Sequence, residues 1–95
     1  MQVQHESGEN KGAFYVEENG KRLAAMTYSM TPEKLLLIDH TEVDDSLRGK
    51  NVGYQLLQQL VEYARAENIK VIPLCPFAKA TFEKKGAEFA DVLRY

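Results

Sequence analysis

The sequence predicts a single α/β domain of mixed α+β character, in which an antiparallel β-meander is followed by a β-α-β-α-β unit around one central mixed sheet. Three observations lead to this prediction. Asn19-Gly20 separates two strand-like runs and favours a tight hairpin. The apolar residues of 52–64 then recur at helical spacing. A short apolar run at 69–74 follows this helix, and a strand reached through a helix is expected to pair in parallel.

The first half of the chain is expected to consist of strands. The runs GAFYVEE (12–18) and KRLAAMTYS (21–29) flank Asn19-Gly20, two residues that readily adopt the positive φ angles of a type I′ turn. A second turn at 31–33 leads into KLLLIDHTEV (34–43), whose content of Leu, Ile and Val is typical of a central strand. These three runs predict an antiparallel meander.

The second half is expected to alternate helices and short strands. One apolar stripe predicts a helix from about 49 to 66, and the polar residues 44–46 precede it in positions that can cap its free amides. After the strand at 69–74, a second helix is predicted over 78–85, with Gly86 as its C-terminal stop. A last short strand is expected at 92–93.

Length and composition limit the possible functions. The 95 residues fit one domain over 1–95, with 1–11 expected to be a flexible tail or an edge strand. The net charge of −2 argues against nucleic-acid binding, which needs a basic face. No apolar run approaches the roughly 18 residues of a membrane span, and the polar N-terminus lacks a signal-peptide core, so a cytoplasmic location is expected. The single cysteine excludes an internal disulfide, no metal-ligand spacing is present, and nothing in the sequence indicates an oligomeric state.

Residues 44–53 have two interpretations. In the first they are only a well-capped helix start. In the second they bind an anion, because a helix N-terminus carries unpaired N–H groups and partial positive charge. Gly49 and Gly53 lack a Cβ atom, so a ligand can approach their backbone. Arg48 and Lys50 add cations to an end where cations are unfavourable unless an anion joins them.

The run Arg48-Gly49-Lys50-Asn51-Val52-Gly53 resembles the pyrophosphate loop of the GNAT acetyltransferase superfamily, whose pattern is [R/Q]-x-x-G-x-[G/A]. The segment CPFAKATFEKKGAEF (75–89) is similar to the later segment of that superfamily, N-x-x-A-x-x-x-Y-E-K-x-G-F. The closest resemblance is to a minimal single-domain subgroup with an R-G-K-x-x-G loop and a P-L-C-P-F segment. One position departs, since Asn51 stands where the family usually has Gly, although Asn tolerates left-handed backbone geometry.

The resemblance implies a GNAT-like fold that binds acetyl-CoA or CoA as cosubstrate. Loop amides would hold the pyrophosphate, and a backbone N–H near Val43 would polarise the thioester carbonyl. Separately from the resemblance, Lys79 lies one turn from Cys75 on the second helix and is expected to reach the 3′-phosphate of CoA. For Lys84 and Lys85, the simpler interpretation is that they form a helix face exposed to solvent. The expected CoA-binding residues are Val43, Arg48, Gly49, Lys50, Asn51, Val52, Gly53 and Lys79.

Two further departures bear on the chemistry. The family's usual general acid, a Tyr, is Phe82 here, and the Asn that opens the later segment is Cys75. Cys75 precedes a helix, where a thiolate is accessible, so it is a candidate nucleophile or acid. A buried packing role for this residue stays open.

His40 is the candidate base, since imidazole titrates near neutral pH. It lies at period two from Leu36 and Ile38, which predicts that the three side chains share one face of a strand. A strand histidine paired with its neighbours is the alternative.

The sequence therefore predicts an acetyl-CoA-dependent N-acetyltransferase that acts on an unidentified amine, with Cys75 and His40 at the reactive end. The alternative from another class is a non-catalytic CoA or acyl-CoA sensor or interaction module. In a third interpretation the glycine loop is purely structural.

Overall fold

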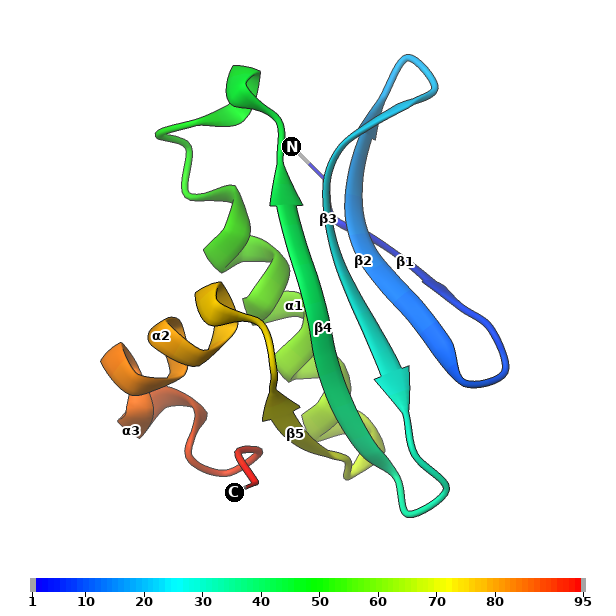
Figure 1. Cartoon of the computed structure of the whole chain (residues 1–95), viewed down its shortest axis with the longest axis vertical. Coiled ribbons are helices and arrows are strands. Elements are labelled where there is room, and N and C mark those ends of the chain that lie inside the picture. Colours follow the sequence, from blue (N-terminus) through cyan, green and yellow to red (C-terminus); the bar gives the residue numbers. More distant parts are fainter. Residues whose placement is uncertain (1, 95) are drawn as a thin grey trace.

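A five-stranded mixed sheet in sequential order, β1-β2-β3-β4-β5, forms the centre of the molecule (Figure 1). The computed structural model describes residues 2–94. The first three strand pairs are antiparallel and β4 pairs with β5 in parallel, which confirms the predicted fold class. The elements are β1 (Gln4–Ser7), β2 (Lys11–Glu18), β3 (Lys21–Met30), β4 (Leu35–Val43), a 3-10 turn η1 (Asp45–Leu47), α1 (Val52–Glu67), β5 (Lys70–Pro73), α2 (Pro76–Lys84) and α3 (Gly86–Phe89).

The hairpin prediction is confirmed by the backbone. Asn19 has φ 53° and Gly20 has φ 77°, the pair of positive angles that a type I′ turn requires. At the N-terminus, Gln4 pairs with Tyr15, so β1 is an edge strand rather than a loose tail. The second turn also contains a left-handed residue, Lys34, with φ 64°.

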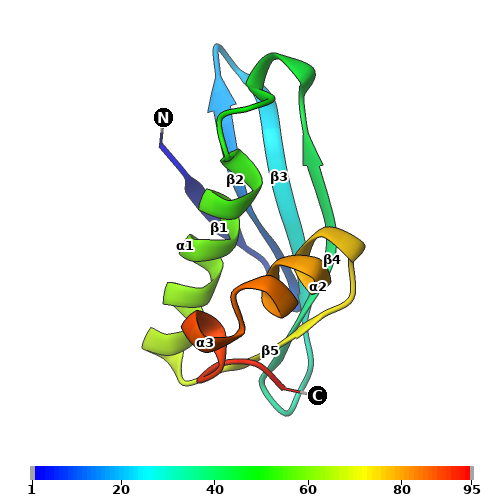
Figure 2. The same cartoon turned by 90° about the vertical axis from the view of Figure 1, so that its left-hand side faces the viewer.

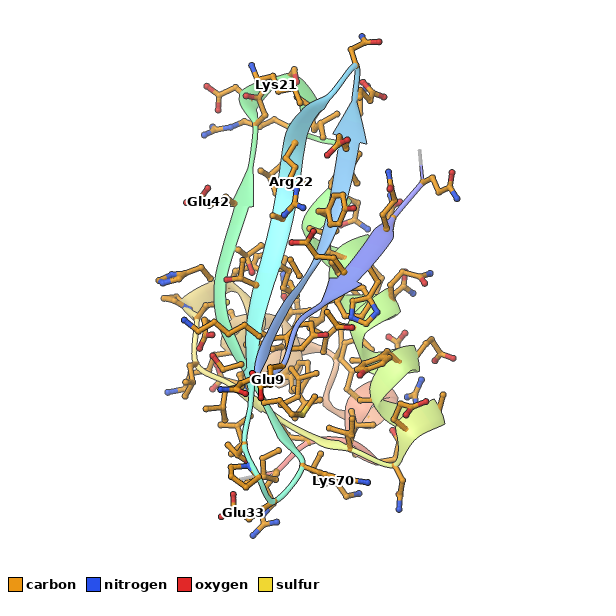
Figure 3. The ribbon with its side chains drawn as sticks, turned by 90° about the vertical axis from the view of Figure 1, so that its right-hand side faces the viewer. Glu9, Lys21, Arg22, Glu33, Glu42 and Lys70 are labelled. Atoms are coloured by element: carbon orange, nitrogen blue, oxygen red, sulfur yellow. The ribbon has the colours of Figure 1, made fainter. Side chains whose placement is uncertain are left out.

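The hydrophobic core lies between one face of the sheet and α1. Figure 2 shows α1 lying along one face of the sheet, and its apolar stripe is fully buried in the core that it shares with the strands. Full burial of one such aliphatic side chain stabilises the fold by roughly 1.5–3 kcal/mol. Within the described chain, the other face of the sheet carries no helix, as Figure 3 shows with Arg22 and Glu42 on that side. The buried stripe comprises Leu56, Leu57, Leu60, Val61 and Ala64.

A β-bulge interrupts β4. Thr27 pairs with His40 but Tyr28 pairs with Ile38, so Asp39 is an extra residue in the register. A bulge shifts the alternation of side chains by one position. Leu36 and Ile38 are buried, and His40 is exposed on the opposite face. The prediction that His40 shares a face with those two residues is therefore wrong.

The β4–β5 pairing is short. It joins Leu35–Ile38 to Lys70–Pro73, and β4 then continues to Val43 without this neighbour (Figure 1). The chain leaves the sheet where the amides of Leu74 and Cys75 both donate to the Ile38 carbonyl, at 3.0 and 3.1 Å. The two strands separate at this point, and one edge of β4 is open beyond it.

Several predicted element ends are wrong. α1 begins at Val52 rather than near residue 49, because residues 45–47 form the separate 3-10 turn. Asp44 caps that turn, accepting from the Ser46 amide at 3.0 Å, and does not cap α1. Gly86 opens α3 instead of ending a helix in the left-handed region. The last predicted strand is reduced to one parallel bridge between Val71 and Leu93.

Candidate active site

The loop of residues 48–51, between η1 and α1, leads to a helix N-terminus with free backbone N–H donors. Asn51 precedes α1 with φ 59° and makes no side-chain cap, and the first backbone bond back to it comes from Gln55, at 3.2 Å. The amides of the first helical residues thus lack an intrahelical acceptor, as at any uncapped helix N-terminus. The predicted tolerance of Asn51 for left-handed geometry is confirmed. These donors and the local helix dipole suit a phosphate.

The two loop glycines have different roles. Gly49 has φ +80°, a conformation that L side chains rarely adopt, and a Cβ atom there would meet nothing within 4 Å. A Cβ on Gly53 would lie 2.6 Å from Cζ of Phe77. Gly53 therefore lets the Phe77 ring of α2 pack on α1, whereas the sequence suggested only access for a ligand.

The loop cations differ in their partners. Arg48 Nε lies 3.0 Å from Asp45 Oδ1, and both side chains are highly exposed. Such a surface pair contributes at most about 1 kcal/mol, so an incoming phosphate can compete for the guanidinium. Lys50 is exposed, and none of the ion pairs in the described residues involves it. The cation excess noted in the sequence is thus partly offset by a carboxylate of the same turn.

The open edge of β4 presents the Val43 amide. The Asp44 N–H donates to Leu23 O at 2.7 Å, toward β3. Amides alternate in direction along a strand, so the Val43 N–H points to the opposite edge, where β5 has already ended. A carbonyl placed along this edge can accept a hydrogen bond from Val43.

Cys75 is the N-cap of α2 and is only 5% exposed. Its Sγ accepts a hydrogen bond from the Ala78 amide at 3.4 Å and lies 3.4 Å from Thr41 Oγ1. The partner Thr41 was missed by the sequence reasoning. A regular strand would place Thr41 on the outer face, and only the bulge turns it toward the thiol.

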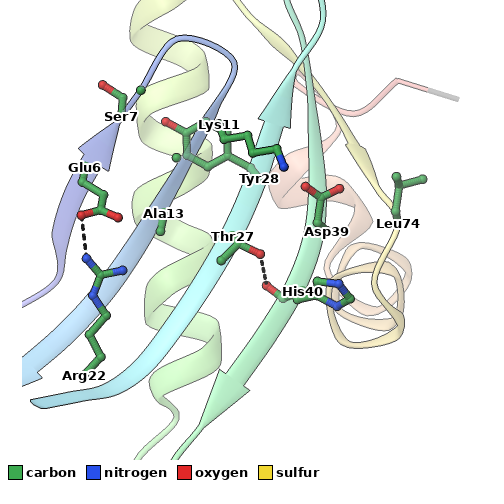
Figure 4. Close-up of a pocket in the computed structure, with 12 residues that line it drawn as sticks. Glu6, Ser7, Lys11, Ala13, Arg22, Thr27, Tyr28, Asp39, His40 and Leu74 are labelled. Carbon is green, nitrogen blue, oxygen red and sulfur yellow. Dashed lines mark hydrogen bonds and ion pairs between the residues drawn. The ribbon is translucent and has the colours of Figure 1, made fainter.

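His40 borders a hollow on the surface, whereas Cys75 is part of the core. The hollow is open, has a volume of about 820 Å³ and lies on the helix-free face of the sheet, where Thr27, Asp39 and Leu74 also border it (Figure 4). Cys75 belongs to the core on the helix side of the sheet. The two predicted catalytic residues thus lie on opposite faces of β4, near the point where β4 and β5 separate.

The lysines of α2 are distributed over two hollows. Lys79 lines a crevice of about 300 Å³ that it shares with Phe82 and Arg94, away from the loop. Lys84 and Lys85 border a shallow hollow of about 240 Å³ that includes Asn51 of the loop. The lysines that the sequence suggested to be a solvated face are therefore closer to the loop than the lysine it favoured.

The described part of the chain has neither a cluster of metal ligands nor a helix that could span a membrane. Residues 2–94 contain no group of three or more His, Cys, Asp or Glu side chains arranged to hold a metal ion. None of the described helices is long and apolar enough to cross a membrane.

A parallel strand pair that separates beside the N-terminus of α1 is the main feature of this α/β domain. The sequence model of the family described as GCN5-related N-acetyl-transferase matches residues 13–92. The chain therefore belongs to the GCN5-related N-acetyltransferase family. This assignment identifies it as an acyltransferase.

Solved structures support the assignment. A GCN5-like candidate N-acetyltransferase from Staphylococcus aureus is 41% identical, with a TM-score of 0.71, and the match covers 96% of this chain and 87% of that protein. The ribosomal-protein-S18-alanine N-acetyltransferase from Escherichia coli shares the fold at 20% identity and a TM-score of 0.68, with coverage of 84% and 54%. A candidate streptothricin acetyltransferase from Bacillus anthracis, solved with acetyl coenzyme A, shares it at 17% identity and a TM-score of 0.61, with coverage of 82% and 47%. The chain therefore spans about half the length of the Escherichia coli and Bacillus anthracis proteins. Among curated protein sequences, no match was found.

Proposed function

We propose that the protein transfers an acetyl group from acetyl-CoA to an amine. The observation that carries the proposal is the position of uncapped helix amides beside the open edge of β4. The amides at the start of α1, with Arg48 and Lys50, would hold the pyrophosphate. The pantetheine would then run along the β4 edge, and the Val43 N–H would stabilise the oxyanion that develops on the thioester carbonyl.

The acceptor amine would approach from the helix-free face. His40 would take a proton from the ammonium group, and the free amine nitrogen would then attack the acetyl carbon. As the tetrahedral intermediate collapses, the bond between this carbon and the CoA sulfur breaks, the nitrogen loses its second proton, and the departing thiolate takes up one proton, so that one proton is released overall. The separation of β4 and β5 supports this arrangement, because it leaves the sheet open between the two faces.

Cys75 has three possible roles within this proposal. It can donate the proton that the thiolate takes, or its own thiolate can accept the acetyl group before the amine does. In the third role its side chain only packs, which its 5% exposure and its place in the core favour. Intact mass after incubation with acetyl-CoA separates the covalent role, since only that role adds one acetyl group that Cys75→Ala removes.

Calorimetry with CoA and acetyl-CoA tests the binding step. Lys50→Gln should weaken binding by about fivefold, equivalent to roughly 1 kcal/mol for one exposed charge. The matched control is Lys34→Gln, the same charge change in the turn between β3 and β4, which should leave binding unchanged. Absence of heat at millimolar ligand would reject the proposal.

Release of free thiol from acetyl-CoA in the presence of an amine panel tests turnover. Release above the buffer rate is the expected result. Binding without release would instead favour a CoA sensor or interaction module, the function consistent with Phe82 in place of a proton donor. The two measurements thus separate the enzyme from the binding module.

A further inference from the structure

The β4 bulge places two consecutive side chains on the open face of the sheet. Asp39 is the extra residue of the register, and both Asp39 and His40 border the 820 Å³ hollow. In a regular strand, neighbouring side chains point to opposite faces. Figure 4 shows the Asp39 and His40 side chains on the same face of β4, with the carboxylate between the end of Lys11 and Leu74 and the imidazole pointing away from it.

Within residues 2–94, the Asp39 carboxylate is held by the hydroxyl of Ser29 on the neighbouring strand β3. Ser29 Oγ donates to Asp39 Oδ2 at 2.5 Å, in a partly buried setting. None of the ion pairs in residues 2–94 involves Asp39. One carboxylate oxygen is thus fixed by the sheet, and no cation of the described residues forms an ion pair with this carboxylate.

The other charged groups of the hollow are arranged differently. Glu6 is paired with Arg22 at 2.6 Å, at the far end of the hollow (Figure 4). Lys11 also borders the hollow, and its side chain extends toward Asp39 in Figure 4, but none of the ion pairs among residues 2–94 joins the two. Leu74, which is 56% exposed, adds an apolar wall next to Asp39 and His40. The end of the hollow nearest His40 therefore combines an apolar surface with a carboxylate that no ion pair among residues 2–94 engages.

We propose that Asp39 binds the ammonium group of the acceptor and so determines a preference for amines that are protonated near neutral pH. This inference rests on the proposed acetyl transfer at the same site. An alkylammonium ion matches the hollow, because its head pairs with the carboxylate and its stem packs along Leu74. Aromatic amines are mostly uncharged near neutral pH and gain nothing from this pair.

The position of the charge during proton transfer supports the assignment. Before transfer the ammonium ion carries the positive charge, and after transfer the His40 imidazolium carries it. Asp39 and His40 border the same hollow, so one carboxylate would favour the cation in each state. Asp39 acts as a binding residue here, and His40 receives the proton.

The test compares Asp39→Asn with Glu42→Gln. Glu42 is an exposed carboxylate on the same strand and does not border the hollow, so its variant makes the same charge change outside the site. With n-butylamine as acceptor, Asp39→Asn should raise KM at least tenfold, since a charge-assisted hydrogen bond is lost. With aniline, which binds uncharged, the KM values of both variants and the wild type should agree, and Glu42→Gln should match the wild type with both amines.

Binding of n-butylammonium, followed through backbone amide shifts in NMR, keeps the inference testable if no acceptor is acetylated. The wild type should bind it more tightly than 1-butanol, and Asp39→Asn should bind both equally. Equal n-butylammonium binding by wild type and Asp39→Asn, or an equal loss in Glu42→Gln, would overturn the inference. Lack of thiol release with preserved Asp39-dependent binding would reject the acetyl transfer alone.

Discussion

Thr41 Oγ1 lies 3.4 Å from Cys75 Sγ, so the hydroxyl of β4 contacts the thiol at the start of α2. This contact joins the two elements beyond the end of the β4–β5 pairing. A thiol and a hydroxyl can each donate or accept, so the pair remains satisfied whether Cys75 is protonated or not.

Thr41→Val should remove this hydrogen bond and keep the shape of the side chain. The free energy of unfolding should fall by about 0.5–1.5 kcal/mol in chemical denaturation. The S–H stretching band in the infrared should also shift, and it is readily assigned because the chain has one cysteine. Thr41→Ser is the control and should restore the band, whereas an unchanged band in Thr41→Val would show that the thiol does not use this hydroxyl.

Gly53→Ala should destabilise the fold through the Phe77 ring. The new Cβ would lie 2.6 Å from Cζ of Phe77, so the ring must move. Overpacking of this kind costs roughly 1–3 kcal/mol, and the 40% exposure of Phe77 favours the lower end.

Phe77→Ala provides the test of this mechanism. Added to Phe77→Ala, the Gly53→Ala substitution should be neutral or stabilising, because the clash is gone and Ala is the better helix former. A double-mutant cycle on unfolding free energies should therefore show clear coupling between the two positions. Additive effects would mean that Gly53 is required for another reason.

Leu60→Ala should lower the free energy of unfolding by about 2–5 kcal/mol, because Leu60 is fully buried between α1 and the sheet. Leu74→Ala is the matched control on an exposed leucine and should change stability by no more than about 0.5 kcal/mol. Thermal or urea unfolding of both variants measures the difference. A loss in Leu74→Ala as large as that in Leu60→Ala would contradict the assigned core.

Stability should depend on pH through His5. Its ring stacks on Phe14 at 4.0 Å between centroids, and its Nε2 lies 2.6 Å from the Tyr28 hydroxyl. Burial lowers the pKa of His5 below the usual 6.5, and burial likewise raises the pKa of Tyr28 to about 12.

The lowered pKa of His5 determines the direction in which stability changes with pH. Because the folded state holds the His5 proton less tightly than the unfolded state, this contribution is present above pH 6.5 and is lost as the pH falls through 6.5 toward the lower folded pKa. Urea unfolding at pH 7.5 and pH 5 should therefore show a smaller loss on acidification in His5→Gln than in the wild type. An equal loss in both would rule out His5 as the source.

The local signals of the chain predicted much of the fold. Asn19-Gly20 forms the expected turn, and the apolar stripe of α1 is the expected buried face, because both depend on residues a few positions apart. The ends of helices were less predictable. Asp44 was assigned to the wrong helix, since a side chain that caps a 3-10 turn looks the same in sequence as one that caps α1.

The candidate site was predicted in part. The residues of the loop could be recognised by their order, and the geometry of Asn51 agrees with that interpretation. The environments of Cys75 and His40 could not be read from their neighbours in sequence. Thr41 and Asp39 carried no sequence signal at all, because their positions depend on the register between two strands.

By itself, the sequence determined the element order, the buried stripe and the family, since periodicity, turn residues and motif order are local properties. The tertiary structure alone decided which face each residue of β4 occupies. One extra residue in the β3–β4 register turns Asp39 and His40 to the open face and Thr41 to the thiol. It also decided that Gly53 accommodates Phe77, because that contact joins two helices that only the folded sheet brings together.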